Sequence, residues 1–159
     1  MGEYQVTVKS LNPVSVIFKE KTGPYWELGE LFQECFAWAA KNSSELVGAI
    51  MAIYYDNPKD TPVEKCRAAV CVPVKNETNA TEGFQKMVLS HNASAQVTYK
   101  GPYYAAEKMK AYQALRDWIA KNSEYTLAEN FLIEAYLNSP VNTKEEDLIT
   151  EISIPIKKK

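Results

Sequence analysis

Reactive and metal-binding side chains are scarce in this sequence of 159 residues. It has three cysteines, Cys35, Cys66 and Cys71, and a single histidine, His91. An odd number of cysteines with no C-x-x-C pair argues against a disulfide framework and against a zinc site. One histidine supplies neither a metal cluster nor a Ser-His-Asp triad without improbable partners. We therefore expect no metal, no cofactor, and cysteines that pack as small apolar residues.

A charge excess of one sign is also missing, because 20 acidic residues stand against 18 basic ones, a balance of −2. The one basic cluster, Lys157–Lys159, lies at the end of the sequence and is typical of a solvated tail. Proteins that grip phosphates usually carry a basic excess or a basic face. We therefore expect no direct binding of nucleic acid.

Long hydrophobic runs are absent, since none approaches the ~20 residues of a membrane span. Residues 1–5 lack the basic-then-apolar layout of a signal peptide. These absences predict a cytoplasmic protein with no membrane partner. What is present is typical of a folded chain, with 46% of residues hydrophobic and 24% charged. The length fits a single domain over residues 1–159.

The sequence repeats itself in ordered blocks. Three blocks of the first half return in the second: 23–26 at 101–104, 38–43 at 118–123, and 72–74 at 154–156. The offset grows from 78 residues to 80 and then 82, as small insertions in turns or helix ends would produce. The last offset also aligns Tyr54 with Tyr136. We predict one supersecondary unit used twice, over about 4–74 and about 92–156, with a linker over about 75–91.

Hydrophobic periodicity predicts the order strand, helix, strand, strand in both halves. In the first half these elements are expected over 14–18, 28–41, 47–55 and 66–74. In the second half they are expected over 95–100, 104–121, 130–137 and 148–156. The apolar positions of the second helix are Met109, Tyr112, Leu115, Trp118 and Ile119.

These elements predict an α+β fold of duplicated β-α-β-β units with pseudo-twofold symmetry. Each amphipathic helix needs a sheet face to cover, so the economical arrangement is an antiparallel or mixed sheet with both main helices on one side. Two helices that straddle such an axis commonly leave a central groove between them. A sheltered groove of this kind suits a small ligand.

One acidic residue, Glu134, interrupts the apolar segment 131–137. A carboxylate in a buried strand is unfavourable unless it is paired, hydrogen-bonded or neutralised. Strand alternation places it on one face with Leu132 and Tyr136. The offset of 82 aligns it with Ala52, so only one half offers an acid there. The alternative is that the side chain points at water or pairs with a Lys or Arg.

Aromatic residues repeat in register with the elements. Tyr25 and Trp26 in the first half, like Tyr103 in the second, stand where the first strand gives way to the helix. Trp118 occupies a helical position that is more typical of core packing than of a ligand site. A carboxylate among aromatic rings is the chemistry that receives flat or cationic organic molecules, because the rings stack and the acid supplies the counter-charge.

Together these blocks resemble the GyrI-like small-molecule-binding domain, which also forms the effector-binding region of several AraC- and MerR-type transcription regulators. The matching segments are 23–25, 54–58, 66–74, 101–103, 111–115, 118–119, 134–140 and 147–156. The resemblance implies a duplicated fold with a central pocket, where a strand glutamate aligned with Glu134 meets aromatic and often cationic ligands. No helix-turn-helix segment precedes Tyr4, so we expect a stand-alone form that would need a separate protein partner for transcriptional control.

Three functions are compatible with this resemblance. The first is a binding module for lipophilic, aromatic molecules, cations included. We favour it because the sequence contains few candidate catalytic residues. Its expected pocket residues are Glu134, Tyr103, Tyr136, Tyr54, Tyr25, Trp118 and Trp26. The second is a hydrolase that opens strained cyclopropane electrophiles, with Glu134 as general acid or base and Tyr103 or Tyr136 as its helper. The third is an interaction protein that modulates gyrase.

Overall fold

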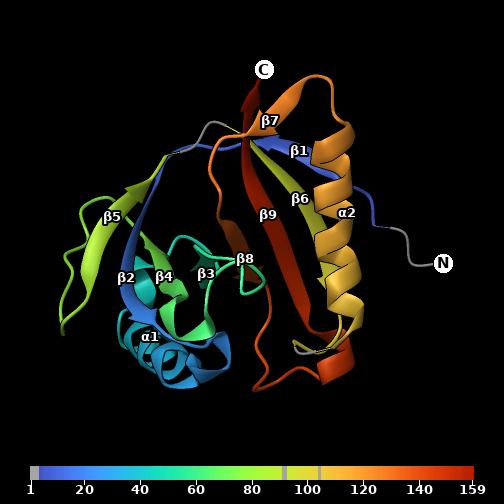
Figure 1. Ribbon diagram of the computed structural model, residues 1–159. Coiled ribbons are helices and arrows are strands. Elements are labelled where there is room, and N and C mark those ends of the chain that lie inside the picture. The colour runs from blue at the N-terminus through green and yellow to red at the C-terminus, as the bar shows by residue number, and fades with distance from the viewer. Residues whose placement is uncertain (1–3, 91–92, 104) are drawn as a thin grey trace. The chain divides into compact units, whose positions relative to one another are not determined.

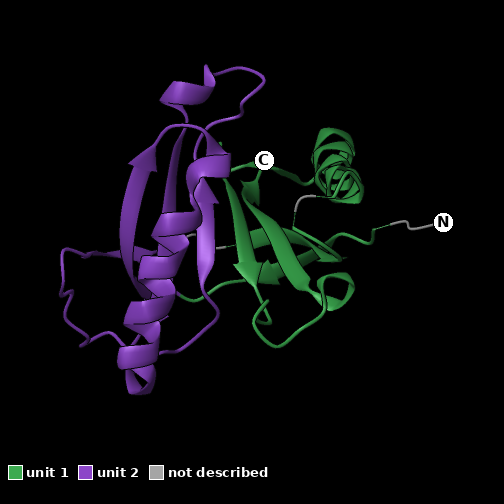
Figure 2. Ribbon diagram, turned by 90° about the horizontal axis from the view of Figure 1, so that it is seen from below, with its two compact units in different colours: residues 1–12, 91–159 green, residues 13–90 purple. Residues whose placement is uncertain are grey.

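The structure, a computed structural model, describes residues 4–90, 93–103 and 105–159. The chain divides into two compact units, which Figure 2 shows in different colours. Unit 2 comprises Pro13–Ser90, and unit 1 combines the N-terminal residues up to Asn12 with the chain from His91 onward. His91 and Tyr104 lie outside the described residues. The boundary after residue 90 falls at the end of the predicted linker, and the expectation of a single domain stays a prediction.

Unit 2 is a four-stranded antiparallel sheet with one α-helix. Its strands pair in the order β3-β4-β2-β5. Their bounds are β2 Val14–Thr22, β3 Met51–Tyr54, β4 Arg67–Val74 and β5 Gln85–Leu89, with helix α1 at Gly29–Lys41. Short 3-10 helices lie at Tyr25–Glu27, Ser43–Glu45 and Val63–Lys65. Helix α1 buries Leu31, Cys35, Trp38 and Ala39 in a core shared with Ile17 of β2 and Val70 and Val72 of β4.

Unit 1 is likewise an antiparallel sheet with one α-helix. Its strands pair in the order β1-β6-β9-β8, and β7 also pairs with β9. Their bounds are β1 Thr7–Ser10, β6 Ala93–Lys100, β7 Tyr125–Leu127, β8 Leu132–Tyr136 and β9 Ile149–Lys158. Helix α2 spans Glu107–Lys121, and a 3-10 helix lies at Glu145–Asp147. Helix α2 lies along β6 and β9 in Figure 1, with Ala111 and Leu115 packed on Val97 and Ile152.

The α+β class is confirmed, and each unit contains the predicted order strand, helix, strand, strand. The shared symmetry axis, the placement of both helices on one side and the central groove stay predictions. Three strands were not predicted: β1, β5 and β7. They are short, and none of them gives a run of buried and exposed residues long enough to show an apolar alternation; β5 lies inside the predicted linker. Met109, taken as an apolar helix position, is 48% exposed, and its neighbour Lys108 faces inward instead.

The three cysteines are buried and free, as predicted. Burial raises the pKa of Cys35 to about 12, so its thiol stays protonated and packs as an apolar group. Within the described residues, no cluster of three His, Cys, Asp or Glu side chains is placed to hold a metal ion. Neither α1 nor α2, as far as the structure describes them, is long and apolar enough to cross a membrane.

Candidate ligand-binding site

Glu134 lies in the middle of strand β8 and is 1% exposed. It stands opposite Ile152 of β9, a core residue under helix α2, and Tyr136 stands opposite Thr150. Leu132, two residues before Glu134, packs against the same core. The predicted alternation is therefore correct, and the acid faces the helix rather than bulk water.

Three side chains hydrogen-bond to the Glu134 carboxylate. The Lys108 ammonium lies 2.7 Å from Oε1, and the Tyr136 hydroxyl donates to the same oxygen at 3.0 Å. The Tyr112 hydroxyl donates to Oε2. The acid is thus both ion-paired and hydrogen-bonded, which is the condition for keeping a carboxylate in a protein interior.

Helix α2 supplies two of these partners because of its register on the sheet. Lys108 and Tyr112 are four residues apart, so they share one helix face. Ala111 and Leu115 on that face are buried in the core and fix the helix against β6 and β9. The first turn of α2 is thereby held where the Lys108 side chain reaches Glu134 of β8.

Lys108 is 8% exposed, which is unusual for a lysine. Its ammonium lies 6.0 Å from the ring centre of Tyr103 and 5.9 Å from that of Tyr112. It also donates a long hydrogen bond, 3.4 Å, to the Tyr103 carbonyl. Lys108 and Glu134 together contribute no net charge, so the cluster is polar but electrically neutral.

Tyr103 and Tyr136 form the aromatic side of the cluster. Their ring centres are 5.4 Å apart and the rings are nearly perpendicular, an edge-to-face pair. Burial raises the pKa of Tyr103, and the nearby Glu134 carboxylate raises it further, so the phenol stays protonated. We call Tyr103, Lys108, Tyr112, Glu134 and Tyr136 the Glu134 cluster.

Unit 2 has an apolar version of this cluster. The positions that the repeat aligns with Lys108, Tyr112 and Glu134 are Leu28, Phe32 and Ala52. Leu28 and Ala52 are buried, and Phe32 packs on the core of unit 2. The same local structure therefore folds around three apolar side chains, which means that the fold itself does not require the polar ones.

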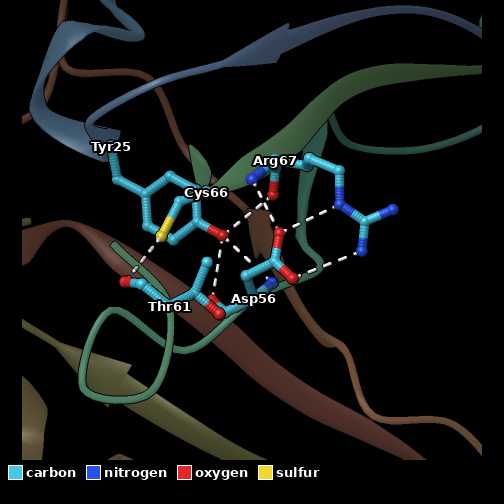
Figure 3. Close-up of polar contacts among 5 residues, drawn as sticks. All are labelled: Tyr25, Asp56, Thr61, Cys66 and Arg67. Carbon is cyan, nitrogen blue, oxygen red and sulfur yellow. Dashed lines mark hydrogen bonds and ion pairs between the residues drawn. The ribbon is translucent and has the colours of Figure 1, made fainter. Parts of the chain in front are cut away.

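Tyr25 and Tyr54 repeat the aromatic pair in unit 2, with ring centres 4.8 Å apart. The Tyr25 hydroxyl contacts main-chain atoms, as Figure 3 shows. It lies 2.9 Å from the carbonyl oxygen of Asp56 and 2.8 Å from that of Arg67, and it accepts from the Asp56 N–H at 3.1 Å. The Asp56 carboxylate binds the Arg67 guanidinium through Nε and Nη2. Tyr25 thus ties the start of β4 to the segment after β3.

We expect Tyr25→Phe to lower the free energy of unfolding at pH 7 by about 1 kcal/mol, because the main-chain contacts are lost. Burial raises the pKa of Tyr25 from 10.0 to about 12. Above pH 10 the phenol ionises in the unfolded chain but not in the folded protein, so the wild type loses stability up to about pH 12. The Y25F variant escapes this loss. Urea unfolding should therefore show a smaller difference at pH 11 than at pH 7, and an equal difference at both would contradict this assignment.

The structure brings three of the seven predicted pocket residues together: Glu134, Tyr103 and Tyr136. Trp118 instead stacks on Tyr125, with ring centres 6.1 Å apart. It lines a separate cavity of about 690 Å³ together with Tyr4. Tyr25, Tyr54 and Trp26 belong to unit 2, where Trp26 is 68% exposed. Their part in a common pocket stays a prediction.

Sequence reasoning missed Lys108 and Tyr112 as partners of the acid. Two signals could have found them. Lys108 occupies the apolar face of its helix, three and seven residues before Ala111 and Leu115. It also stands at the repeat position of a core leucine, Leu28. A lysine in such a position needs an anionic partner.

Comparison with known proteins identifies similar sequences. The family model of the GyrI-like small molecule binding domain matches residues 4–157. A DNA gyrase inhibitor of Erwinia billingiae is 27% identical over 145 residues, which cover 86% of each chain. The testis-expressed protein 264 homolog of Mus musculus is 39% identical over 69 residues, 41% of this chain. That match spans only 20% of the mouse protein.

Solved structures share the fold at low sequence identity. The C-terminal domain of EcmrR has a TM-score of 0.76 and 21% identity, with 98% of this chain and 99% of that one covered. The structure of SAV2435 bound to tetraphenylphosphonium has a TM-score of 0.61 and 16% identity, with 98% and 94% covered. At these identities the likeness establishes the fold alone.

Proposed function

This chain belongs to the GyrI-like small-molecule-binding domain family, and from that premise we propose that it binds a lipophilic, aromatic small molecule at the Glu134 cluster. The protein would sequester or sense this molecule. The aromatic rings of Tyr103 and Tyr136 would pack on the ligand, while Lys108 and Glu134 would recognise its polar group.

The observation that carries this proposal is the contrast between the two units. Replacing a buried ion pair by apolar residues of similar volume is often neutral or stabilising. Unit 2 has apolar residues at all three aligned positions, Leu28, Phe32 and the smaller Ala52, and needs no ion pair there. The polar cluster of unit 1 is therefore better explained by recognition than by stability. The related fold of SAV2435, solved with an aromatic ligand, supports the same proposal.

The variant K108L/Y112F/E134A tests this proposal because it copies unit 2 into unit 1. Isothermal titration calorimetry with triphenylphosphine oxide and with methyltriphenylphosphonium should detect binding to the wild type. We expect the triple variant to bind triphenylphosphine oxide at least about tenfold more weakly than the wild type does, the effect of one charge-assisted hydrogen bond. Its thermal midpoint should stay close to that of the wild type. Unchanged affinity in the variant, or no binding of either probe to the wild type, would contradict the proposal.

Two alternatives stay predictions. The gyrase-modulating function is supported by the relative from Erwinia billingiae named a DNA gyrase inhibitor. A supercoiling assay with stoichiometric amounts of this protein tests it, and inhibition that rises with dose would favour it. The hydrolase function is tested by incubation with a cyclopropane-containing alkylator, in which mass spectrometry would follow ring opening.

The expectation that Glu134 attracts a cationic ligand also stays a prediction. Lys108 already neutralises this carboxylate. The preferred charge of the ligand therefore depends on the pair rather than on the acid alone.

A further inference from the structure

We infer that the Glu134 cluster selects an uncharged aromatic ligand that carries an acceptor oxygen, in preference to a lipophilic cation. This inference rests on the proposed function, because it names the ligand class of the same site. It begins from the ion pair between Lys108 and Glu134, which the protein forms with its own side chains.

The Glu134 carboxylate accepts from Lys108, Tyr112 and Tyr136, so one of its oxygens is shared by two donors and the other is also occupied. A ligand cation would have to displace the Lys108 ammonium from its counter-ion. The displaced ammonium would then be a desolvated charge without a partner, which is strongly unfavourable.

The Glu134 side chain is 2% exposed and the Lys108 side chain is 10% exposed. Tyr103 and Tyr136 are each partly exposed. A ligand that approaches from solvent therefore meets the two rings and the lysine before it reaches the acid.

An ammonium has three N–H groups, and Lys108 directs two of them at Glu134 and at the Tyr103 carbonyl. Among the described residues, the third N–H has no hydrogen-bond acceptor and lies near the rings of Tyr103 and Tyr112. The Tyr103 hydroxyl likewise makes no hydrogen bond within the described part of the chain. Both groups stand beside aromatic rings, so their natural complement is an acceptor oxygen attached to an aromatic body.

Lys108 and Glu134 balance each other, so a ligand with a net charge would bring an uncompensated charge into a mostly buried cluster. Such a charge is unfavourable, whereas a carbonyl or phosphoryl oxygen can accept the free hydrogen bonds without one. An aromatic amide, ketone or phosphine oxide has the required chemistry.

A matched pair of probes tests this inference. Triphenylphosphine oxide and methyltriphenylphosphonium have nearly the same size and shape, but the first offers an oxygen acceptor where the second has a methyl group and a positive charge. We expect titration calorimetry at pH 7 to show that the wild type binds the oxide at least about tenfold more tightly, the effect of one charge-assisted hydrogen bond. A wild type that binds the phosphonium as tightly or more tightly would overturn the inference.

Two variants assign this preference to Lys108. Lys108→Met leaves Glu134 without a cation, so the preference should reverse toward the phosphonium. K108M/E134Q removes both charges, is the safer variant to fold, and should bind both probes within about threefold of each other. A double variant that keeps the wild-type preference for the oxide would overturn the inference. A failure of the proposed function looks different, because both probes would then bind K108L/Y112F/E134A and the wild type equally, or neither would bind.

Discussion

Lys108→Met is expected to lower the free energy of unfolding by about 3–5 kcal/mol, the range for breaking a buried ion pair by removing one partner. The reason is that Glu134, 1% exposed, would keep its charge in the protein interior without the ammonium that lies 2.7 Å from it. The hydroxyls of Tyr112 and Tyr136 would still donate to the carboxylate, but they carry no charge.

Urea unfolding at pH 7 measures this loss, and K108M/E134Q is the matched control. The control removes the stranded charge, and its amide keeps an acceptor oxygen for one of the two tyrosine hydroxyls and offers an N–H group to the other, so it should regain at least half of the lost stability. A K108M variant within about 1 kcal/mol of the wild type would mean that the pair is solvent-screened, as exposed pairs are. A control as unstable as K108M would assign the loss to packing rather than to charge.

Gly101→Ala is expected to lower the free energy of unfolding by about 3 kcal/mol. Gly101 has φ +147°, a conformation that L side chains rarely adopt, and the strain of such a backbone is about 1–3 kcal/mol. A Cβ at this position would lie 2.7 Å from the Tyr99 hydroxyl oxygen. That hydroxyl donates to the Pro102 carbonyl at 2.7 Å, and Tyr99 is 1% exposed, so its ring has little room to move.

Gly23→Ala is the control for that prediction because Gly23 is the repeat equivalent of Gly101. It has nearly the same φ, +144°, but a Cβ there meets no atom within 4 Å. The control should therefore show the backbone strain alone, about 1 kcal/mol. Thermal unfolding of both variants measures the difference between their free energies of unfolding. We expect this difference to be about 1–3 kcal/mol, the usual effect of overpacking a side chain. Equal losses would show that the contact with Tyr99 relaxes without penalty.

Hydrophobic periodicity in the sequence predicted the helices and most of the strands. Strands β2, β4, β6 and β9 and both α-helices lie where the apolar pattern placed them. Strand β3 begins at Met51 instead of the predicted residue 47. Strand β5, which was not predicted, is an edge strand that pairs with β2, and its sequence QKMVL mixes polar and apolar residues without alternation. An edge strand needs no apolar alternation, so the sequence contains no periodicity that predicts β5.

The candidate site could be predicted only in part. Glu134 was found because a charge stands out in an apolar strand, and Tyr103 and Tyr136 were found because they repeat in register. Lys108 was missed because a lysine in a helix is usually solvated, and its partner lies 26 residues further along the chain. Only the packing of helix on sheet brings the two together. Lys108 aligns in the repeat with Leu28, a buried core residue, so a charged residue occupies a position that is apolar in the other half.

The most direct test of a ligand at the Glu134 cluster is a set of nuclear Overhauser contacts between triphenylphosphine oxide and the protein's aromatic rings. With the probe in excess, the account predicts contacts from its phenyl protons to the ring protons of Tyr103 and Tyr136. Contacts to Tyr4 and Trp118 instead, which line the separate cavity of unit 1, would contradict it.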